Sequence, residues 1–230
     1  MMLENKKSND TKINTSMDNK NMSNLPNNTK PNEKGAVSVQ GHIKIFDPNT
    51  KEVFVDKRNA IHYENFSIAL ANSISGQTNG PIAEMVFGNG GSRVDPTGII
   101  TYLTPNTIGS NAALFNQTYY KTVDSKRASS LDPARNFMET RHTTGVPYSD
   151  VLISCLLDFG EPTDQAVFDN ATNQDGTYVF DELGLKSYSS SGENQGLLIT
   201  HVIFHPVQKS LNRMIQVDYT IRIQSISAGI

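Results

Sequence analysis

The sequence has no tryptophan and only one cysteine among its 230 residues. A single cysteine excludes an internal disulfide framework and any metal site built from several thiolates. Cys155 stands in the apolar run VLISCLL, and we expect it to be buried on a strand as a small hydrophobe. A thiolate is disfavoured in such a place, so Cys155 is a poor candidate for a catalytic nucleophile.

Long apolar runs and charge of one sign are also lacking. No run approaches the ~20 apolar residues of a membrane span, and the first residues have no apolar core of the kind that a secretory signal contains. Lys and Arg number 20 against 23 Asp and Glu, with no basic cluster, although nucleic-acid binding depends on neutralising phosphates. We therefore expect a soluble protein, made in a reducing cytoplasm, with no membrane or nucleic-acid partner.

Apolar residues are scarce in residues 1–35, which consist mainly of Asn, Lys, Ser, Thr and Asp. Such a segment cannot bury enough surface to offset the entropy of ordering its chain. Two interpretations stay open: an unstructured tail, or an arm that orders on assembly. Residues 36–230 are expected to form a single β-rich domain.

The clearest strand pattern lies in residues 211–227. Ile215, Val217, Tyr219, Ile221 and Ile223 alternate with polar residues, which predicts a long strand with one buried face. Its other face carries little charge, so we expect that face to be at least partly covered, by irregular segments or by a neighbouring subunit. Residues 197–204 form a second apolar run, and residues 205–211 are expected to join the two strands as a hairpin or meander.

Further elements are predicted nearer the N-terminus. Turn formers at residues 47–50 separate residues 43–46 and 53–55, which predicts a β-hairpin. One amphipathic helix is expected over residues 60–75, capped by Asn59 and ended by Gly76. Its predicted apolar stripe consists of Tyr63, Phe66, Leu70 and Ile74. Residues 82–87 and 151–157 are expected to be short buried strands.

Two long segments show little periodicity, residues 93–150 and 163–196. Both far exceed an ordinary loop of about 4 to 6 residues, so we expect irregular excursions that carry contacts. In the first, Leu114, Phe115, Tyr119 and Tyr120 supply apolar surface for a neighbour; in the second, residues 178–185 are the one apolar cluster. The fold class is therefore mainly β (α+β): an antiparallel β-sandwich or sheet with one packed amphipathic helix and long irregular excursions.

Two short motifs resemble catalytic signatures. The sequence GNGGS at residues 88–92 resembles a phosphate cradle, but no Lys-Ser/Thr and helix follow it, because Pro96 and Gly98 disfavour a helix. A tight turn is the better interpretation. Residues 158–160 read Asp-Phe-Gly, as in kinases, without the catalytic loop or strand lysine that would give them this meaning.

Isolated titratable residues offer no more. Asp181 and Glu182 are interpreted as surface neighbours. His201 and His205, four apart on a strand, would lie about 13 Å apart on one face, too far for one metal ion, and are expected to be surface or interface residues. His42, His62 and His142 have no acidic or cysteine partners at ligand spacing. We predict no catalytic, cofactor-binding or metal-binding residue.

One ordered set of segments resembles a known family. It runs from HIKIFDPNTKEVFVDKRNAIHYENF through SIALANSIS to IAEMVFGNGGSRVDPTGIITYL, then to DFGEP and HVIFHPVQKSLNRMIQVDYTIRI. In this layout residues 42–225 resemble virion structural proteins of tailed bacteriophages, especially tail, baseplate and fibre-attachment subunits, and residues 85–92 are the only compact motif. The resemblance carries no functional residue over to this chain.

The resemblance implies a non-enzymatic structural subunit of a virion, in its tail, baseplate or neck. We expect a homo-oligomeric ring that contacts other virion structural proteins, with no cofactor and no small-molecule substrate. Segments that order on assembly can wrap large surfaces, which agrees with this expectation. The alternatives are a receptor-binding or glycan-binding β-sandwich module, or a hydrolase with clustered carboxylates.

Overall fold

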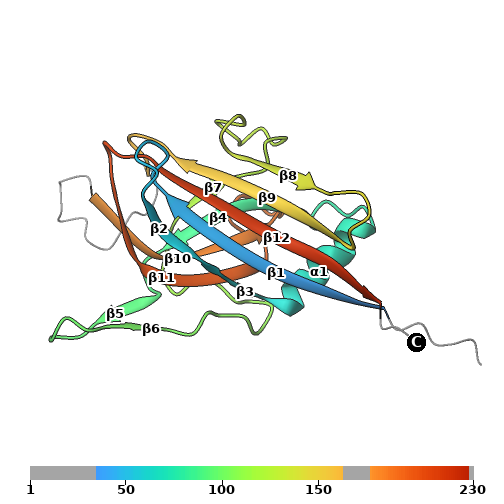
Figure 1. Ribbon diagram of the computed structural model, residues 1–230, viewed down its shortest axis with the longest axis horizontal. Helices are drawn as coiled ribbons and strands as arrows, with labels where there is room; N and C mark the ends of the chain where they lie inside the picture. Colours follow the sequence, from blue (N-terminus) through green and yellow to red (C-terminus); the bar gives the residue numbers. More distant parts are fainter. Residues whose placement is uncertain (1–34, 163–176, 228–230) are drawn as a thin grey trace, which may run out of the picture.

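The computed structural model describes residues 35–162 and 177–227, and it shows a sandwich of two antiparallel five-stranded sheets (Figure 1). The predicted 1–35 arm lies outside the described residues, apart from Gly35. The first sheet has the order β2(Val53–Arg58), β1(Gly35–Phe46), β12(Ile215–Ser227), β9(Tyr148–Leu157) and β8(Phe137–Arg141). The second has the order β3(Ala60–Ile61), β11(Leu198–Ser210), β10(Thr177–Ser187), β4(Ile82–Gly88) and β7(Gln117–Thr122). The mainly β class predicted from the sequence is confirmed.

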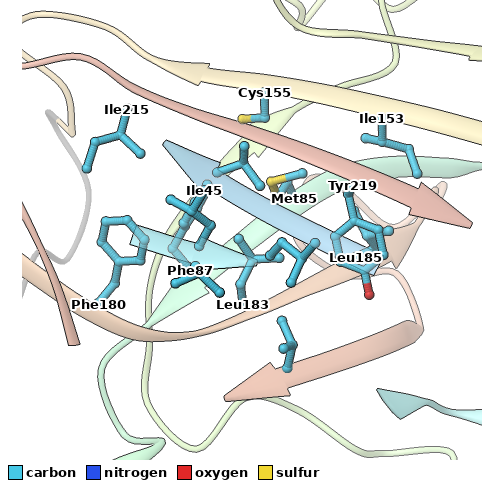
Figure 2. Close-up of a cluster of buried hydrophobic side chains, with 14 of the residues drawn as sticks. Ile45, Met85, Phe87, Ile153, Cys155, Phe180, Leu183, Leu185, Ile215 and Tyr219 are labelled. Atoms are coloured by element: carbon cyan, nitrogen blue, oxygen red, sulfur yellow. The ribbon is translucent and has the colours of Figure 1, made fainter. Parts of the chain in front are cut away.

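The core fills the space between the two sheets, and Figure 2 shows side chains from both sheets pointing into it. Alternate residues of β12, namely Ile215, Val217, Tyr219 and Ile221, are buried as their period of two predicts. Facing them are Phe87, Phe180 and Leu183 of the second sheet. Phe180 contacts Phe87 edge to face, with ring centroids 5.5 Å apart, an arrangement that suits the quadrupoles of the rings.

Several predicted elements are confirmed. β1 and β2 form the expected hairpin, and the Asp47 carboxylate accepts hydrogen bonds from the amides of Asn49 and Thr50 in the turn. β4 and β9 are buried strands in the expected places. Cys155 on β9 is buried, and burial raises the pKa of its thiol to about 12.

The predicted hairpin or meander of the two closing strands is wrong. β11 lies in the second sheet beside β10, whereas β12 lies in the first sheet between β1 and β9. Residues 211–214 therefore cross from one sheet to the other. Each strand pairs with partners that are distant in sequence, and alternation along one strand does not reveal those partners.

The helix is shorter than predicted. α1(Tyr63–Ile74) begins after β3, whose Ala60 and Ile61 pair with β11. His62, not Asn59, is its N-cap, because its Nδ1 atom accepts the Asn65 amide at 3.2 Å. The end is as predicted, since Gly76 has a φ of 73°, a conformation that glycine adopts without steric cost. In its described part the protein has no helix long and apolar enough to cross a bilayer.

The apolar stripe of α1 is only partly as predicted. Tyr63 and Ile74 are 71% and 80% exposed, while Phe66 and Leu70 are half-buried. The fully buried positions are Asn65 and Ala69. Asn65 faces inward because its Nδ2 donates to the carbonyl oxygen of Leu198 on β11, at 2.9 Å. This hydrogen bond to the backbone of β11 helps to fix which face of α1 points inward.

The two predicted excursions contain strands of the main sheets. Residues 93–150 include β7 and β8, the edge strands of the second and first sheets, and most of a small hairpin, β5(Ser92–Val94) and β6(Ile100–Tyr102). Residues 163–196 include β10, a central strand; residues 163–176 lie outside the described residues. The sequence did not predict β10, because Asp181, Glu182 and Lys186 interrupt its apolar pattern. All three side chains are nevertheless buried.

The outer face of β12 is half-buried, as predicted, although neighbouring strands cover it in part. Arg222 donates from Nε and Nη2 to the two carboxylate oxygens of Asp150 on β9, both at 2.8 Å. Gln216 donates to the hydroxyl of Ser154 at 2.6 Å. Cross-strand polar pairs of this kind stabilise a sheet face that water still reaches.

Candidate functional site: a projecting hairpin on a buried polar network

The glycine-rich loop at residues 88–92 does wrap an anion, but the anion belongs to the protein itself. The amides of Gly91 and Ser92 donate to the two carboxylate oxygens of Asp181, at 2.9 and 2.7 Å. The Gly90 amide donates to Oε1 of Glu182 at 3.1 Å. Two carboxylates of β10 therefore occupy the place that a phosphate cradle would offer, and the tight-turn interpretation missed this role.

Two positions of this loop require glycine, because neighbouring atoms approach the backbone closely. A Cβ on Gly88 would lie 2.5 Å from Glu182 Oε1 and 2.5 Å from the carbonyl oxygen of Asn116. On Gly90 it would lie 2.7 Å from the amide nitrogen of Asn116. Side chains at these positions would displace the loop at residues 103–116 from the carboxylate, because real Cβ atoms do not tolerate such distances.

Glu182 is the centre of the network and is fully buried. Its Oε1 accepts the amides of Gly90 and Asn116, and its Oε2 accepts the Phe115 amide at 2.9 Å and His201 Nε2–H at 3.0 Å. Burial by itself raises the pKa of Glu182, but these hydrogen bonds outweigh it and hold the pKa below its ordinary value. Glu182 therefore remains a carboxylate, with four donors around it.

His201 is buried beside Glu182, contrary to the prediction of a surface or interface role. Its Nδ1 accepts the Asn106 amide at 2.7 Å, so Nε2 carries the proton donated to Glu182. The Phe115 ring packs on the imidazole, with ring centroids 5.5 Å apart. The prediction that Asp181 and Glu182 are surface neighbours is also wrong. Both carboxylates, with His201, anchor the loops at residues 88–92 and 103–116 to the second sheet.

Each of these loops leads directly into the β5–β6 hairpin. Leu103 donates its amide to the carbonyl oxygen of Gly91 at 2.9 Å, which closes the base of the hairpin. At its tip the Asp95 carboxylate accepts the Thr97 hydroxyl and the amides of Thr97 and Ile99, and these bonds lower the pKa of Asp95. The hairpin is thus defined at both its base and its turn.

The hairpin projects from the body of the sandwich at one end of the molecule (Figure 1). Its apolar residues are largely solvent-exposed: Val94 by 64%, Ile99 by 60% and Tyr102 by 51%. The Tyr102 hydroxyl lies 3.1 Å from Nδ1 of His205, which is exposed on β11. A projecting apolar surface on a well-defined base is typical of an interaction site.

Three further buried charged residues are hydrogen-bonded within the protein. Lys186 Nζ donates to the carbonyl and side-chain oxygens of Asn194, and the Asn194 amide donates to the carboxylate of Glu84. Burial raises the pKa of Glu84 and lowers that of Lys186. Lys209 is fully buried, its pKa lowered by burial to about 8, and its Nζ donates to the carbonyl oxygen of Ser210.

The remaining histidines are dispersed. His42 Nε2 lies 2.8 Å from a carboxylate oxygen of Asp56, His62 caps α1, and His142 Nδ1 lies 3.0 Å from the carbonyl oxygen of Tyr148. Within residues 35–162 and 177–227, no three side chains of His, Cys, Asp or Glu come together as a metal site requires.

The predicted docking residues of the 93–150 segment divide into two groups. Leu114 and Tyr119 are buried in the protein's own core, so that part of the prediction is wrong. Phe115 is partly exposed, and Tyr120 is half-buried, with its hydroxyl donating to Glu193 at 2.9 Å.

The sequence did contain a signal for the buried network around Glu182. A histidine inside the apolar run LLITHVIF and two acids inside YVFDELGL need buried partners.

An apolar groove lies between α1 and the first sheet. It has a volume of about 460 Å³. Phe66 and Leu70 of α1 line one side, and Met138, Val151 and Ile223 line the other. We call it the α1 groove.

Comparison of the sequence with protein families and with curated proteins, and of the structure with solved structures, found no match.

Proposed function

We propose that the protein is a structural subunit of a tailed-phage virion, in the tail, baseplate or neck, that works through contacts with copies of itself and with other virion proteins. The observation that carries the proposal is the β5–β6 hairpin, which exposes apolar side chains on an internally anchored base. The layout of residues 42–225, which resembles such subunits, supports the same assignment.

The energetics of the hairpin favour a docking role. A two-stranded hairpin alone is marginally stable in water, and this one gains no core of its own, since Val94 and Ile99 are both exposed. The base of the hairpin is instead held by the buried carboxylate of Asp181, which accepts hydrogen bonds from the amide and the hydroxyl of Ser92. Covering Val94, Ile99 and Tyr102 with a neighbouring protein would give the hairpin the apolar partner that it lacks.

A ring follows if the hairpin docks on a different surface of the next copy. Such a contact is heterologous, and repeated heterologous contacts close into a ring when the rotation allows it. The hairpin lies at one end of the molecule and the tips of β1 and β12 at the other (Figure 1), which suits a head-to-tail arrangement.

The test compares two exposed apolar positions by size-exclusion chromatography with light scattering. Ile99→Asp places a charge on the hairpin and is expected to weaken self-association by at least about tenfold, the effect of ~1.4 kcal/mol. Leu131→Asp is the matched control, since Leu131 is 94% exposed outside the hairpin; it should associate like the wild type. Equal weakening in both variants, or none in Ile99→Asp, contradicts the proposal.

The virion assignment needs a separate experiment. Antibodies raised against the purified chain and coupled to gold should label intact phage particles at the tail, baseplate or neck in electron micrographs. Particles that carry no label, together with absence of the chain from their protein content by mass spectrometry, would overturn the phage assignment even if the protein forms oligomers.

A further inference from the structure

The α1 groove continues into an uncovered apolar surface at the tips of β1 and β12. Residues 35–39 pair with residues 223–227 in an unbroken register, and we call this pair of segments the terminal ribbon. Val37 and Val39 share the inner face of β1 with the buried residues Ile43 and Ile45, because they differ by even numbers of residues. Yet Val37 is 59% exposed and Val39 half-buried.

The inner face of the first sheet thus becomes progressively uncovered toward the ribbon. On β12, Ile221 is buried, whereas Ile223, opposite Val39, is half-buried and lines the α1 groove. From Ile223 to the tip is four residues, roughly 13 Å at ~3.3 Å per residue. Ile223, Val39 and Val37 form a short apolar strip that runs from the groove along the ribbon, with Ser225 opposite Val37. None of the described residues covers this strip fully.

Residues 1–34 join the described structure at the end of this strip, because β1 begins with Gly35 at the ribbon tip. Fully extended, they reach about 110 Å. Their composition is polar, but they hold seven apolar residues: Met1, Met2, Leu3, Ile13, Met17, Met22 and Leu25. Four of these are methionines, and the flexible methionine side chain fills irregular apolar gaps.

The position of Gly35 favours a neighbouring groove over the chain's own. The ribbon tip, where residues 1–34 join β1, lies at one end of the molecule (Figure 1), which is a suitable place for contact with a neighbouring copy. The own groove begins only about 13 Å away, and a 34-residue arm is far longer than that distance requires. A segment of this length can therefore reach the groove of a neighbouring copy.

We propose that residues 1–34 of one copy lie in the α1 groove and along the terminal ribbon of a second copy. Apolar side chains of the arm would cover Ile223, Val39 and Val37, and each arm would link adjacent subunits. This inference rests on the proposed self-association but uses a surface other than the β5–β6 hairpin.

Cross-linking between two differently tagged full-length chains tests the proposal. One chain carries Ser23→Cys in the arm, and the other carries Thr140→Cys at the groove. Cys155 stays in place because it is fully buried. With a short bismaleimide, the mixed pair is expected to give a heterodimer containing both tags. Asn49→Cys in the β1–β2 turn is the control, because it lies beyond the other end of the 12-residue β1, roughly 36 Å from the ribbon tip; it should give little product.

Each other outcome overturns the proposal in a recognisable way. A cross-link confined to single chains that carry both Ser23→Cys and Thr140→Cys would place the arm in its own groove. Equal products with Thr140→Cys and Asn49→Cys would mean that the arm has no fixed site. No product, while light scattering still shows oligomers, would refute the arm contact and leave the proposed function standing; a monomer throughout would refute both.

A variant of the ribbon gives a second measurement. Val37→Ser removes apolar surface from a mostly exposed position, so folding should change little. We expect association between copies to weaken roughly fivefold to tenfold and the Ser23–Thr140 cross-link to fall with it. Unchanged yield and unchanged association would contradict the assigned surface.

Discussion

Replacing Glu182 by glutamine tests the buried network that holds the hairpin. Gln keeps one oxygen, which can still accept the amides of Gly90 and Asn116, but it turns an NH₂ group toward the donors of Phe115 and His201. His201 cannot simply change tautomer, because its Nδ1 already accepts the Asn106 amide. Two buried donors therefore lose their acceptor.

The cost of Glu182→Gln follows from those two donors. Leaving a buried donor unsatisfied costs about 1–3 kcal/mol, so we expect the free energy of unfolding to fall by about 2–6 kcal/mol. Urea unfolding, followed by circular dichroism, measures this change. Glu52→Gln is the matched control, because the side chain of Glu52 is 63% exposed and pairs with Arg213 at the surface; it should cost less than about 1 kcal/mol. If the two variants lose equal stability, the assigned role of Glu182 is wrong.

Glu182→Gln should also weaken the dependence of folding stability on acidic pH. The pKa of Glu182 is lower in the folded protein than its ordinary value of 4.5, so the unfolded chain binds a proton first as the pH falls. Its stabilising contribution is present above the unfolded pKa and is lost as pH falls through the folded pKa. The urea midpoint of the wild type should therefore decline more steeply below about pH 4.5 than that of Glu182→Gln. Parallel curves would contradict the pKa assignment.

Three further outcomes are expected. Lys209 has a pKa lowered to about 8, so the unfolded chain binds more protons between that pH and ~10.4, and stability should rise over this range relative to Lys209→Met; an identical pH dependence in urea unfolding contradicts this. Gly184→Ala places a Cβ 2.6 Å from the carbonyl oxygen of Thr200 and should cost about 1–3 kcal/mol in the same assay, whereas Gly35→Ala, with open space around it, should be neutral. Cys155 should resist a thiol reagent in the native protein and react fully in urea, since burial raises its pKa to about 12; rapid native labelling would show that β9 is not buried.

The sequence was informative where one strand has one buried face. β12 and the β1–β2 hairpin alternate apolar and polar residues, and the turn at Asp47 uses ordinary turn formers. These elements were therefore predictable from local pattern. The pairing of β12 with β1 and β9, and of β11 with β10, depends on contacts between distant segments, so the sequence alone suggested a hairpin that does not exist.

The site was less accessible to prediction, because its chemistry is hidden in the core. Asp181 and Glu182 look like surface acids in a sequence, and only the fold brings them to the amides of residues 90–92 and 115–116. The glycines of the 88–92 loop were recognised, but their reason is the approach of Glu182 and Asn116 and not a bound phosphate. The projection of the hairpin could not be read from residues 93–150, where apolar residues are sparse.

The central claim, self-association through the β5–β6 hairpin, is tested most directly by sedimentation equilibrium of the full chain and of Ile99→Asp over a range of concentrations. The wild type should show a mass that rises with concentration to a fixed multiple of 25.3 kDa, and Ile99→Asp should remain near the monomer mass at the same concentrations. A wild-type mass of one subunit at every concentration, or identical association by both proteins, would contradict the claim.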